Sequence, residues 1–499
     1  MVTEAIRFSD RGERRLVLLL CLLATLHGFI FSAAFPFFNN VDEREHFDLV
    51  LKYAHGEIPR KLDLLSGEAL NLIALYNAPG YGEAKTNTAA EPPPPGTLPT
   101  DEQAAWLAAN LPGYAGTNYE SSQPPAYYAV AGAWWNLGGR LGLGGVGRLY
   151  WLRFLNLPVV GLLVWLSWLA ALTVSPDKNF FLRLGVPAFL AFMPQSVFYS
   201  VDNDVFSPLC FGLAFVCLLR FWAAENPPVW LGAVSGLALA AAFLTKMTNL
   251  PPLLVTAAAL VLFISHRWRA AKLAPTLPAL TAMALCALPP VVAWLAWCQK
   301  NFDDLTGSSI KARFWGWTLK PFPEWFHHPI FTPAGARKFS AFFITEFWQG
   351  EMSWHGQPLS FRAASWAYVL VTLSLLVAAV AVILRRSAGP PWPVRRALWF
   401  SLFTFASCAG FLVYVSIRFD FHECHYPSRA IPYLFSGRLA LGALIPFMLL
   451  LVSGLDRVLE RFSVRAKFLV LGALILAMLA NEIATDWPVF ASKYNWFHL

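Results

Sequence analysis

The sequence predicts an all-α polytopic membrane protein with about eleven transmembrane helices. Of its 499 residues, 57% are hydrophobic and 14% are charged, and the mean hydropathy is +0.49. The apolar residues form runs long enough to cross a bilayer, which requires about 20 residues of helix. The net charge of +8 comes from Lys and Arg in short clusters between these runs, not from one basic face. These features exclude a soluble enzyme, a disordered scaffold and a nucleic-acid binder.

The first apolar run, residues 16–35, predicts a retained anchor with a cytoplasmic N-terminus, because four arginines between residues 7 and 15 precede it. A cleaved signal peptide is the alternative, since Ser32-Ala33-Ala34 resembles a cleavage site. The run is longer than the roughly 7–15 residues of a signal core, which favours the anchor. The further spans are expected at residues 151–174, 184–201, 205–222, 229–246, 250–265, 274–297, 364–384, 397–418, 437–455 and 468–485.

The segment Ala126–Trp135 decides the orientation of all later spans. It is apolar and aromatic but short, and Gly138, Gly139 and Arg140 follow it. If it lies at the outer interface and does not cross, every short basic loop faces the cytoplasm, as the positive-inside rule requires. The basic residues of these loops are Lys178, Arg183, Arg267, Arg269, Lys272, Arg385, Arg386, Arg395, Arg396, Arg457, Arg461, Arg465 and Lys467.

This topology predicts the domain organisation. Residues 1–298 form an N-terminal membrane module whose first outer loop, 36–150, carries the acidic site. Residues 299–363 form an extracytoplasmic loop, and 364–499 supply the C-terminal membrane helices. Within the first loop, the periodicity of 42–56 predicts an amphipathic helix lying on the membrane. The Pro-rich and Gly-rich stretch 77–118 predicts an irregular loop.

Acidic residues mark two points of the outer surface. Asp42 and Glu43 follow the first span, where a carboxylate can accept a proton from a substrate hydroxyl while its neighbour orients the group. The alternative is a solvated helix N-terminus favoured by the helix dipole. Asp202 and Asp204 lie between two later spans and are suited to a divalent metal or a sugar hydroxyl. They are equally typical of turn and cap residues.

Three basic residues lie on the outer side, against the positive-inside bias. They are Lys246, Arg429 and Arg438. Arginine binds phosphate oxygens in a bidentate way and lysine supplies a point charge, so a lipid phosphate is a natural partner. Snorkelling to lipid headgroups is the alternative. His422, Glu423 and His425 resemble a metal-binding cluster only weakly, and whether the protein uses a divalent metal stays open.

The order of these features resembles the GT-C class of integral membrane glycosyltransferases. The resemblance rests on Asp42-Glu43 after the first span, on the segment Gln123-Pro124-Pro125-Ala126-Tyr127-Tyr128 and on Asp202–Asp204, with Ser436-Gly437-Arg438 as a weaker match. It is strongest over residues 36–250 and is closest to bacterial relatives of protein O-mannosyltransferases and aminoarabinose transferases.

This resemblance implies that one sugar moves from a polyprenyl-phosphate donor to a glycan, lipid or protein acceptor, with inversion. The reaction would occur on the extracytoplasmic side of a bacterial inner membrane. Asp42 and Glu43 would activate or orient the acceptor, and Asp202 or Asp204 would supply the acid of the second loop. Gln123, Tyr127 and Tyr128 would line the cavity. Lys246, Arg429 and Arg438 would hold the donor phosphate. This role rests partly on the resemblance and partly on their positive charge, because the basic residues of the class vary in position. Metal use differs within the class.

Three other functional classes remain open from the sequence, one of which is a purely structural membrane subunit. A transporter or lipid flippase would place ionisable residues at the membrane midplane and use discontinuous helices. A polymerase or ligase acting on a diphosphate-linked oligosaccharide would also combine membrane spans with a large outer loop. The charged residues gather at the outer rim and the outer loops are long, which favours the transferase.

Overall fold

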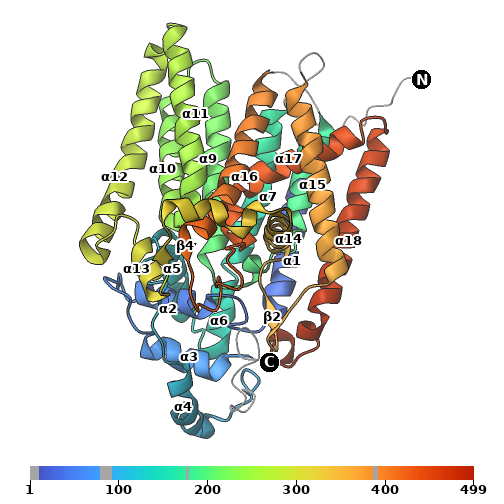
Figure 1. Cartoon of the computed structure of the whole chain (residues 1–499). Coiled ribbons are helices and arrows are strands. Elements are labelled where there is room, and N and C mark those ends of the chain that lie inside the picture. Colours follow the sequence, from blue (N-terminus) through green and yellow to red (C-terminus); the bar gives the residue numbers. More distant parts are fainter. Residues whose placement is uncertain (1–9, 79–92, 176–178, 386–391) are drawn as a thin grey trace.

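The computed structural model describes residues 10–78, 93–175, 179–385 and 392–499 (Figure 1). Helices dominate this part of the chain, and the strands described in it are two residues long. β1 (Thr318–Leu319) pairs antiparallel with β4 (Phe419–Asp420), and β2 (Ser353–Trp354) pairs antiparallel with β3 (Gln357–Pro358). The predicted all-α polytopic class is therefore confirmed.

Among the described residues, nine helical stretches are long and apolar enough to cross a membrane. They contain α1 (Asp10–Ala34), α6 (Gly145–Arg153) with α7 (Asn156–Val174), α9 (Phe206–Ala223), α11 (Leu250–Arg269), α12 (Leu277–Phe302), α15 (Arg362–Leu384), α16 (Trp392–Arg418), α17 (Leu444–Val458) and α18 (Val464–Phe490). Two shorter apolar helices, α8 (Phe180–Ala191) and α10 (Val229–Thr245), complete the bundle. Each of the eleven predicted spans overlaps one of these stretches.

The predicted span 184–201 is shorter than expected. Its helix, α8, ends at Ala191, and the chain continues through the short 3₁₀ helices η2 (Ser196–Tyr199) and η3 (Asn203–Val205). Pro194 explains the break, because proline lacks an N–H and disfavours helical backbone in the residue before it. The polar residues after it are buried. Irregular backbone at this depth is tolerated where protein surrounds it.

The first loop forms a helical layer at one end of the bundle (Figure 1). It contains α2 (Glu43–Ala54), α3 (Gly67–Tyr76), α4 (Thr100–Tyr114) and α5 (Ala126–Arg140). α5 packs against α2 and is not among the candidate spans, which agrees with the interpretation of Ala126–Trp135.

Two expectations for this loop need correction. The helix predicted at 42–56 is present, but it is not exposed on a membrane surface, because its polar residues Asp48 and Lys52 are buried together with Phe47 and Leu49. The helix packs against α5 and α3. The stretch 77–118 is not irregular throughout, since it contains α4, and residues 79–92 lie outside the described part.

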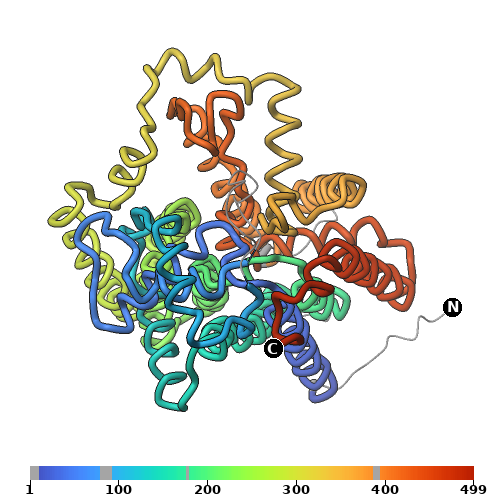
Figure 2. Tube along the Cα trace, turned by 90° about the horizontal axis from the view of Figure 1, so that it is seen from below, coloured from blue at the N-terminus to red at the C-terminus, as the bar shows by residue number. Residues whose placement is uncertain are grey.

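The second loop, 299–363, returns to the bundle. It contains α13 (Ser308–Phe314), η6 (Phe322–His327), η7 (Pro329–Phe331) and α14 (Pro333–Gln349). Figure 2 shows it as a yellow arc along one edge of the molecule. α14 packs against α15 and against η8 (Gly437–Ala443), the short helix that precedes α17. This packing places residues of both loops at the ends of the spans.

The short basic connections lie at the end of the molecule opposite to the first-loop helices. The connection between α11 and α12 and the connection between α17 and α18 both lie at that end, as does the start of α1 (Figure 1). They contain the clusters Arg267 to Lys272 and Arg457 to Lys467. The long loops and the basic loops are therefore separated by the length of the spans.

Candidate active site

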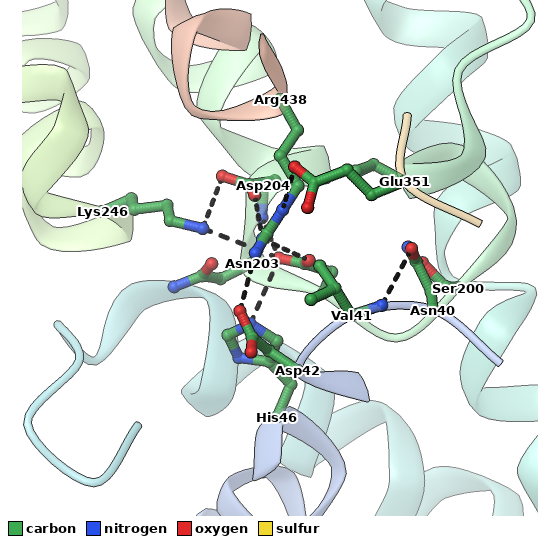
Figure 3. A network of polar contacts seen from close by, with 12 residues as sticks. Asn40, Val41, Asp42, His46, Ser200, Asn203, Asp204, Lys246, Glu351 and Arg438 are labelled. Carbon is green, nitrogen blue, oxygen red and sulfur yellow. Dashed lines mark hydrogen bonds and ion pairs between the residues drawn. The ribbon is translucent and has the colours of Figure 1, made fainter. Parts of the chain in front are cut away.

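Arg438 lies at the centre of a cluster of carboxylates (Figure 3). Arg438 lies in η8 and is 5% exposed to solvent. Its Nη1 donates to Asp204 at 2.8 Å and to Asp202 at 3.2 Å, and its Nη2 donates to Asp42 at 2.6 Å. Its Nε donates to Glu351 at 3.3 Å. Charge-assisted bonds of this kind are about twice as strong as neutral ones. Arg438 thus joins the first loop, the segment before α9 and the second loop.

The backbone before Arg438 comes unusually close to α14. A Cβ at Gly437 would overlap the backbone of Phe343 and Phe347, so only glycine permits this approach. The Gly437 N–H donates to the carboxylate of Glu346 at 3.3 Å. Gly437 therefore fixes the position from which Arg438 enters the cluster.

Asp202 and Asp204 enter the cluster from the irregular segment before α9. The Asp202 carboxylate accepts the Asp204 N–H at 2.8 Å, which caps η3. Both side chains are essentially buried, at 0% and 1% exposure. Lys246 follows the end of α10, and its Nζ lies 2.6 Å from Asp204 Oδ1 and 3.9 Å from Asp202 Oδ1. The structure thus brings Asp202, Asp204, Lys246 and Arg438 together.

Asp42 is held in a left-handed backbone conformation with φ 61° at the start of α2. Such a conformation costs energy in a residue other than glycine and is often found at functional sites. Its side chain does not cap the helix. Instead, Oδ1 accepts the Tyr119 hydroxyl at 2.7 Å and Oδ2 binds Arg438. Burial acts to raise the pKa of Asp42, but Arg438, Lys311 and His46 hold it below its ordinary value.

Glu43 points to a different partner. Arg153 donates to its carboxylate at 2.8 and 3.2 Å, and the Val201 N–H donates at 3.0 Å. Arg153 also donates to the carbonyl oxygens of Phe35 and Pro36. Both charged side chains are buried, at 0% and 1% exposure. The structure therefore separates the adjacent acids: Asp42 joins the Arg438 cluster, whereas Glu43 ties the start of α2 to α6.

The segment that begins at Gln123 lies beside the same cluster. Gln123 Nε2 donates to Glu120 at 2.6 Å, and Lys311 of α13 also binds Glu120. Tyr127 lies close enough to Asp202 to interact with it. Tyr128 contacts His46, whose Nδ1 is 2.7 Å from its hydroxyl oxygen. Gln123, Tyr127 and Tyr128 thus border the cluster.

Arg429 is not part of the cluster. Its guanidinium binds Asp420 at 2.9 Å and contacts His422 at 2.8 Å in the loop after α16. Its side chain is 58% exposed and lines a separate cavity of about 370 Å³. The expectation that Arg429 and Arg438 form one cationic group is corrected, because Asp420 pairs with Arg429 within its own loop.

Several residues of the cluster were not found from the sequence. They are His46, Tyr119, Glu120, Lys311 and Glu351. The His46 Nε2 lies 3.4 Å from Asp202 Oδ1. His46 is four residues after Asp42, so its place on the same face of α2 was the one available signal. The others come from loops without a periodic pattern.

Comparison with known proteins places the chain in a family. Residues 25–420 match the model of the family described as "Predicted membrane protein (DUF2142)". The chain belongs to this family. Among solved structures it is similar to ArnT from Cupriavidus metallidurans bound to undecaprenyl phosphate, with 15% sequence identity and a TM-score of 0.33. The similarity covers 90% of this chain and 78% of the ArnT chain. No curated protein matches the sequence.

In this DUF2142 protein, a cavity of about 860 Å³ lies beside Glu351. α14, the β2–β3 hairpin, α15 and the loop before η8 form its walls. Its apolar lining includes Phe342, Trp366 and Val369, of which the first two are large exposed side chains. Its polar lining includes Glu346, Glu351 and Arg362.

The carboxylates of the cluster are already paired with cations. Within the described residues, no group of three or more His, Cys, Asp and Glu side chains is arranged to hold a metal ion. Asp202 and Asp204 bind Arg438 and Lys246 instead. The arrangement of these described residues therefore does not fit a metal site.

Proposed function

We propose that this protein transfers a sugar from a polyprenyl-phosphate donor to a hydroxyl acceptor, with inversion at the anomeric carbon. The observation that carries this proposal is the contact of Arg438 with Asp42 and with Asp204, which also binds Lys246. Glu351 links Arg438 to the cavity of about 860 Å³. One side of the cluster offers a carboxylate to the acceptor. The other offers cations to a phosphate.

The chemistry follows from these two groups. The acceptor oxygen attacks the anomeric carbon, and its proton passes to the carboxylate of Asp42. The bond between the anomeric carbon and the phosphate oxygen breaks, and polyprenyl phosphate leaves. Arg438 and Lys246 stabilise the negative charge that grows on this leaving group. The low pKa of Asp42 in the free protein reflects its pairing with Arg438, and contact between Arg438 and a phosphate would weaken that pairing.

The cavity suits a lipid donor. Phe342 and Trp366 offer exposed apolar surface to a prenyl chain, and apolar burial is worth about 25 cal/mol per Å². Glu351 joins this cavity to Arg438. In this proposal, Glu43 keeps α2 in position through Arg153 and does not touch the substrate. The site faces the extracytoplasmic side of a bacterial inner membrane, opposite the basic loops.

The proposal is tested by donor turnover. Purified protein is incubated with a panel of radiolabelled polyprenyl-phosphate sugars, with and without EDTA, and release of free polyprenyl phosphate is followed. For the Asp42→Asn variant we expect turnover to fall by roughly 10²–10⁴-fold, as for loss of a general base. Glu57→Gln is the matched control, because Glu57 is exposed at the end of α2. Near-normal turnover of folded Asp42→Asn protein would eliminate the assignment.

A transporter is the second candidate, because ionisable side chains also meet within the spans. His27 of α1 lies 2.9 Å from Glu482 of α18, and the Tyr199 hydroxyl donates to Glu482 at 2.5 Å. Ionisable residues at such depth often mark transport pathways. Substrate accumulation in proteoliposomes without a covalent product would favour this function.

A ligase that uses diphosphate-linked oligosaccharides would not use the monophosphate donors of the turnover assay.

A further inference from the structure

Glu351 differs from the other three carboxylates on Arg438. It comes from the second loop, whereas Asp42, Asp202 and Asp204 come from the first loop and the segment before α9. Its contact with Arg438 Nε is 3.3 Å, which is the longest of the four. Of these carboxylates, Glu351 is the one that also lines the cavity of about 860 Å³.

The backbone places Glu351 at the junction of cavity and cluster. Gly350 ends α14 with φ 77°, and a Cβ there would overlap Ser196 of the irregular segment. Gln195 of that segment donates to the last carbonyl groups of α14, including Phe347 O at 2.7 Å. The chain therefore turns at Gly350, and the next side chain projects from the cavity wall to Arg438.

Ionisable groups of both signs surround Glu351, and Arg362 of α15 and His425 of the loop after α16 line the same cavity. Arg438 faces it from η8, Asp42 from the first loop, and Asp204 from η3. Glu346 of α14 and Tyr426 of the loop after α16 also lie close enough to interact with it. Burial raises the pKa of Glu351 above its ordinary value, against the opposing effects of Arg438 and Ser436, and Asp42 and Asp204 raise it further. Glu351 is thus easier to neutralise than an exposed glutamate.

We propose that Glu351 occupies the donor-phosphate position on Arg438 in the free protein, and that a lipid phosphodiester entering from the cavity displaces it. This inference rests on the proposed function. When Glu351 is ionised, one anion replaces another at the Nε edge of Arg438. Asp202 and Asp204 keep their contacts with Nη1. The exchange is easier when Glu351 is protonated, because its hold on Arg438 is then lost.

The test measures binding and does not depend on turnover. The probe is a prenyl methyl phosphodiester, whose single charge does not change between about pH 5 and pH 8. Its affinity for the full-length protein in detergent is measured across this range. We expect the wild-type affinity to fall as pH rises, because ionised Glu351 competes for Arg438. Glu351→Gln should bind about tenfold more tightly at pH 8, with a weaker dependence on pH.

The matched control is Glu346→Gln. Glu346 lines the same cavity but contacts the Gly437 N–H and not Arg438. Its carboxylate does not hold the Arg438 guanidinium, so Glu346→Gln should change the probe affinity less than Glu351→Gln does. If Glu351→Gln does not fold, Glu351→Asp serves instead, because its shorter side chain withdraws from Arg438.

The outcomes separate this inference from the proposed function. Equal affinity of wild type and Glu351→Gln, or equal gains in Glu346→Gln and Glu351→Gln, would overturn the role of Glu351 while leaving a phosphate-binding site. Probe binding by Glu351→Gln alone would support displacement in its strongest form. If folded wild-type protein and every variant fail to bind the probe, the phosphate-lipid donor itself is refuted.

Discussion

The carboxyl group of Glu45, in the first loop, has a pKa close to physiological pH. It is half-buried in the first turn of α2. Burial, the nearby Asp42 and Glu120 raise its pKa from 4.5 to about 7, and Arg44 opposes this shift. The folded protein therefore binds a proton at Glu45 more tightly than the unfolded chain does.

This shift predicts a pH dependence of stability. A carboxyl whose folded pKa is raised contributes stability below the unfolded value near 4.5, and the contribution is lost as pH rises through about 7. Glu45→Gln should therefore be more stable than wild type at pH 8, by about 1–3 kcal/mol after allowance for partial exposure. The two proteins should converge toward pH 4.5. Thermal unfolding in detergent measures this, with Glu57→Gln as control, and parallel pH profiles would contradict it.

At the scale of elements, the buried pair of Arg153 and Glu43 holds the start of α2 against α6. The guanidinium also stacks over the Phe37 ring, 4.4 Å from its centroid, and donates to two carbonyl groups at the end of the first span. Removing one partner of a buried ion pair leaves an unpaired charge in a poorly polar surrounding. Asp42 depends on this arrangement, since it directly precedes Glu43.

Arg153→Met should therefore lower the free energy of unfolding by about 3–5 kcal/mol. The double variant Arg153→Met/Glu43→Gln should recover part of this loss, because no unpaired carboxylate remains. Thermal unfolding compares the two, and Arg140→Met is the control because Arg140 is exposed at the end of α5. If the double variant is as unstable as the single one, the loss comes from packing and the carbonyl contacts, and the ion pair contributes little.

Two elements, α8 and α2, show which structural features hydropathy and periodicity do not predict. Hydropathy averages over a window, so the run 184–201 looked continuous although its helix ends at Ala191. The residues after Pro194 are apolar enough to be predicted as part of a span. In the structure their backbone is irregular, and it positions Asp202 and Asp204 to bind Arg438. In the same way, the period of α2 predicted its helix but not the layer that buries it.

At the scale of the whole molecule, charge and hydropathy predicted which residues lie at the ends of spans but not which loops meet there. Asp42, Asp202, Asp204, Lys246 and Arg438 stand out because an ionisable residue beside an apolar run is unusual. Asp42 and Arg438 are 396 positions apart, and their contact depends on the full bundle. Glu351 and Lys311 lie on loops whose paths follow tertiary packing, so no local pattern could place them.

The separation of long loops from basic loops predicts the orientation of the molecule in its membrane. Lys and Arg are retained on the cytoplasmic side, so the end with the α11–α12 and α17–α18 connections should be cytoplasmic. In a variant with its seven cysteines replaced, Glu324→Cys in the second loop should react with a membrane-impermeant thiol reagent added to intact spheroplasts. Ala270→Cys, exposed between α11 and α12, should react only after permeabilisation. The reverse pattern would place Asp42 and Arg438 in the cytoplasm. A transferase that works outside the cell membrane would then be excluded, because its lipid donor and acceptor would face the wrong compartment.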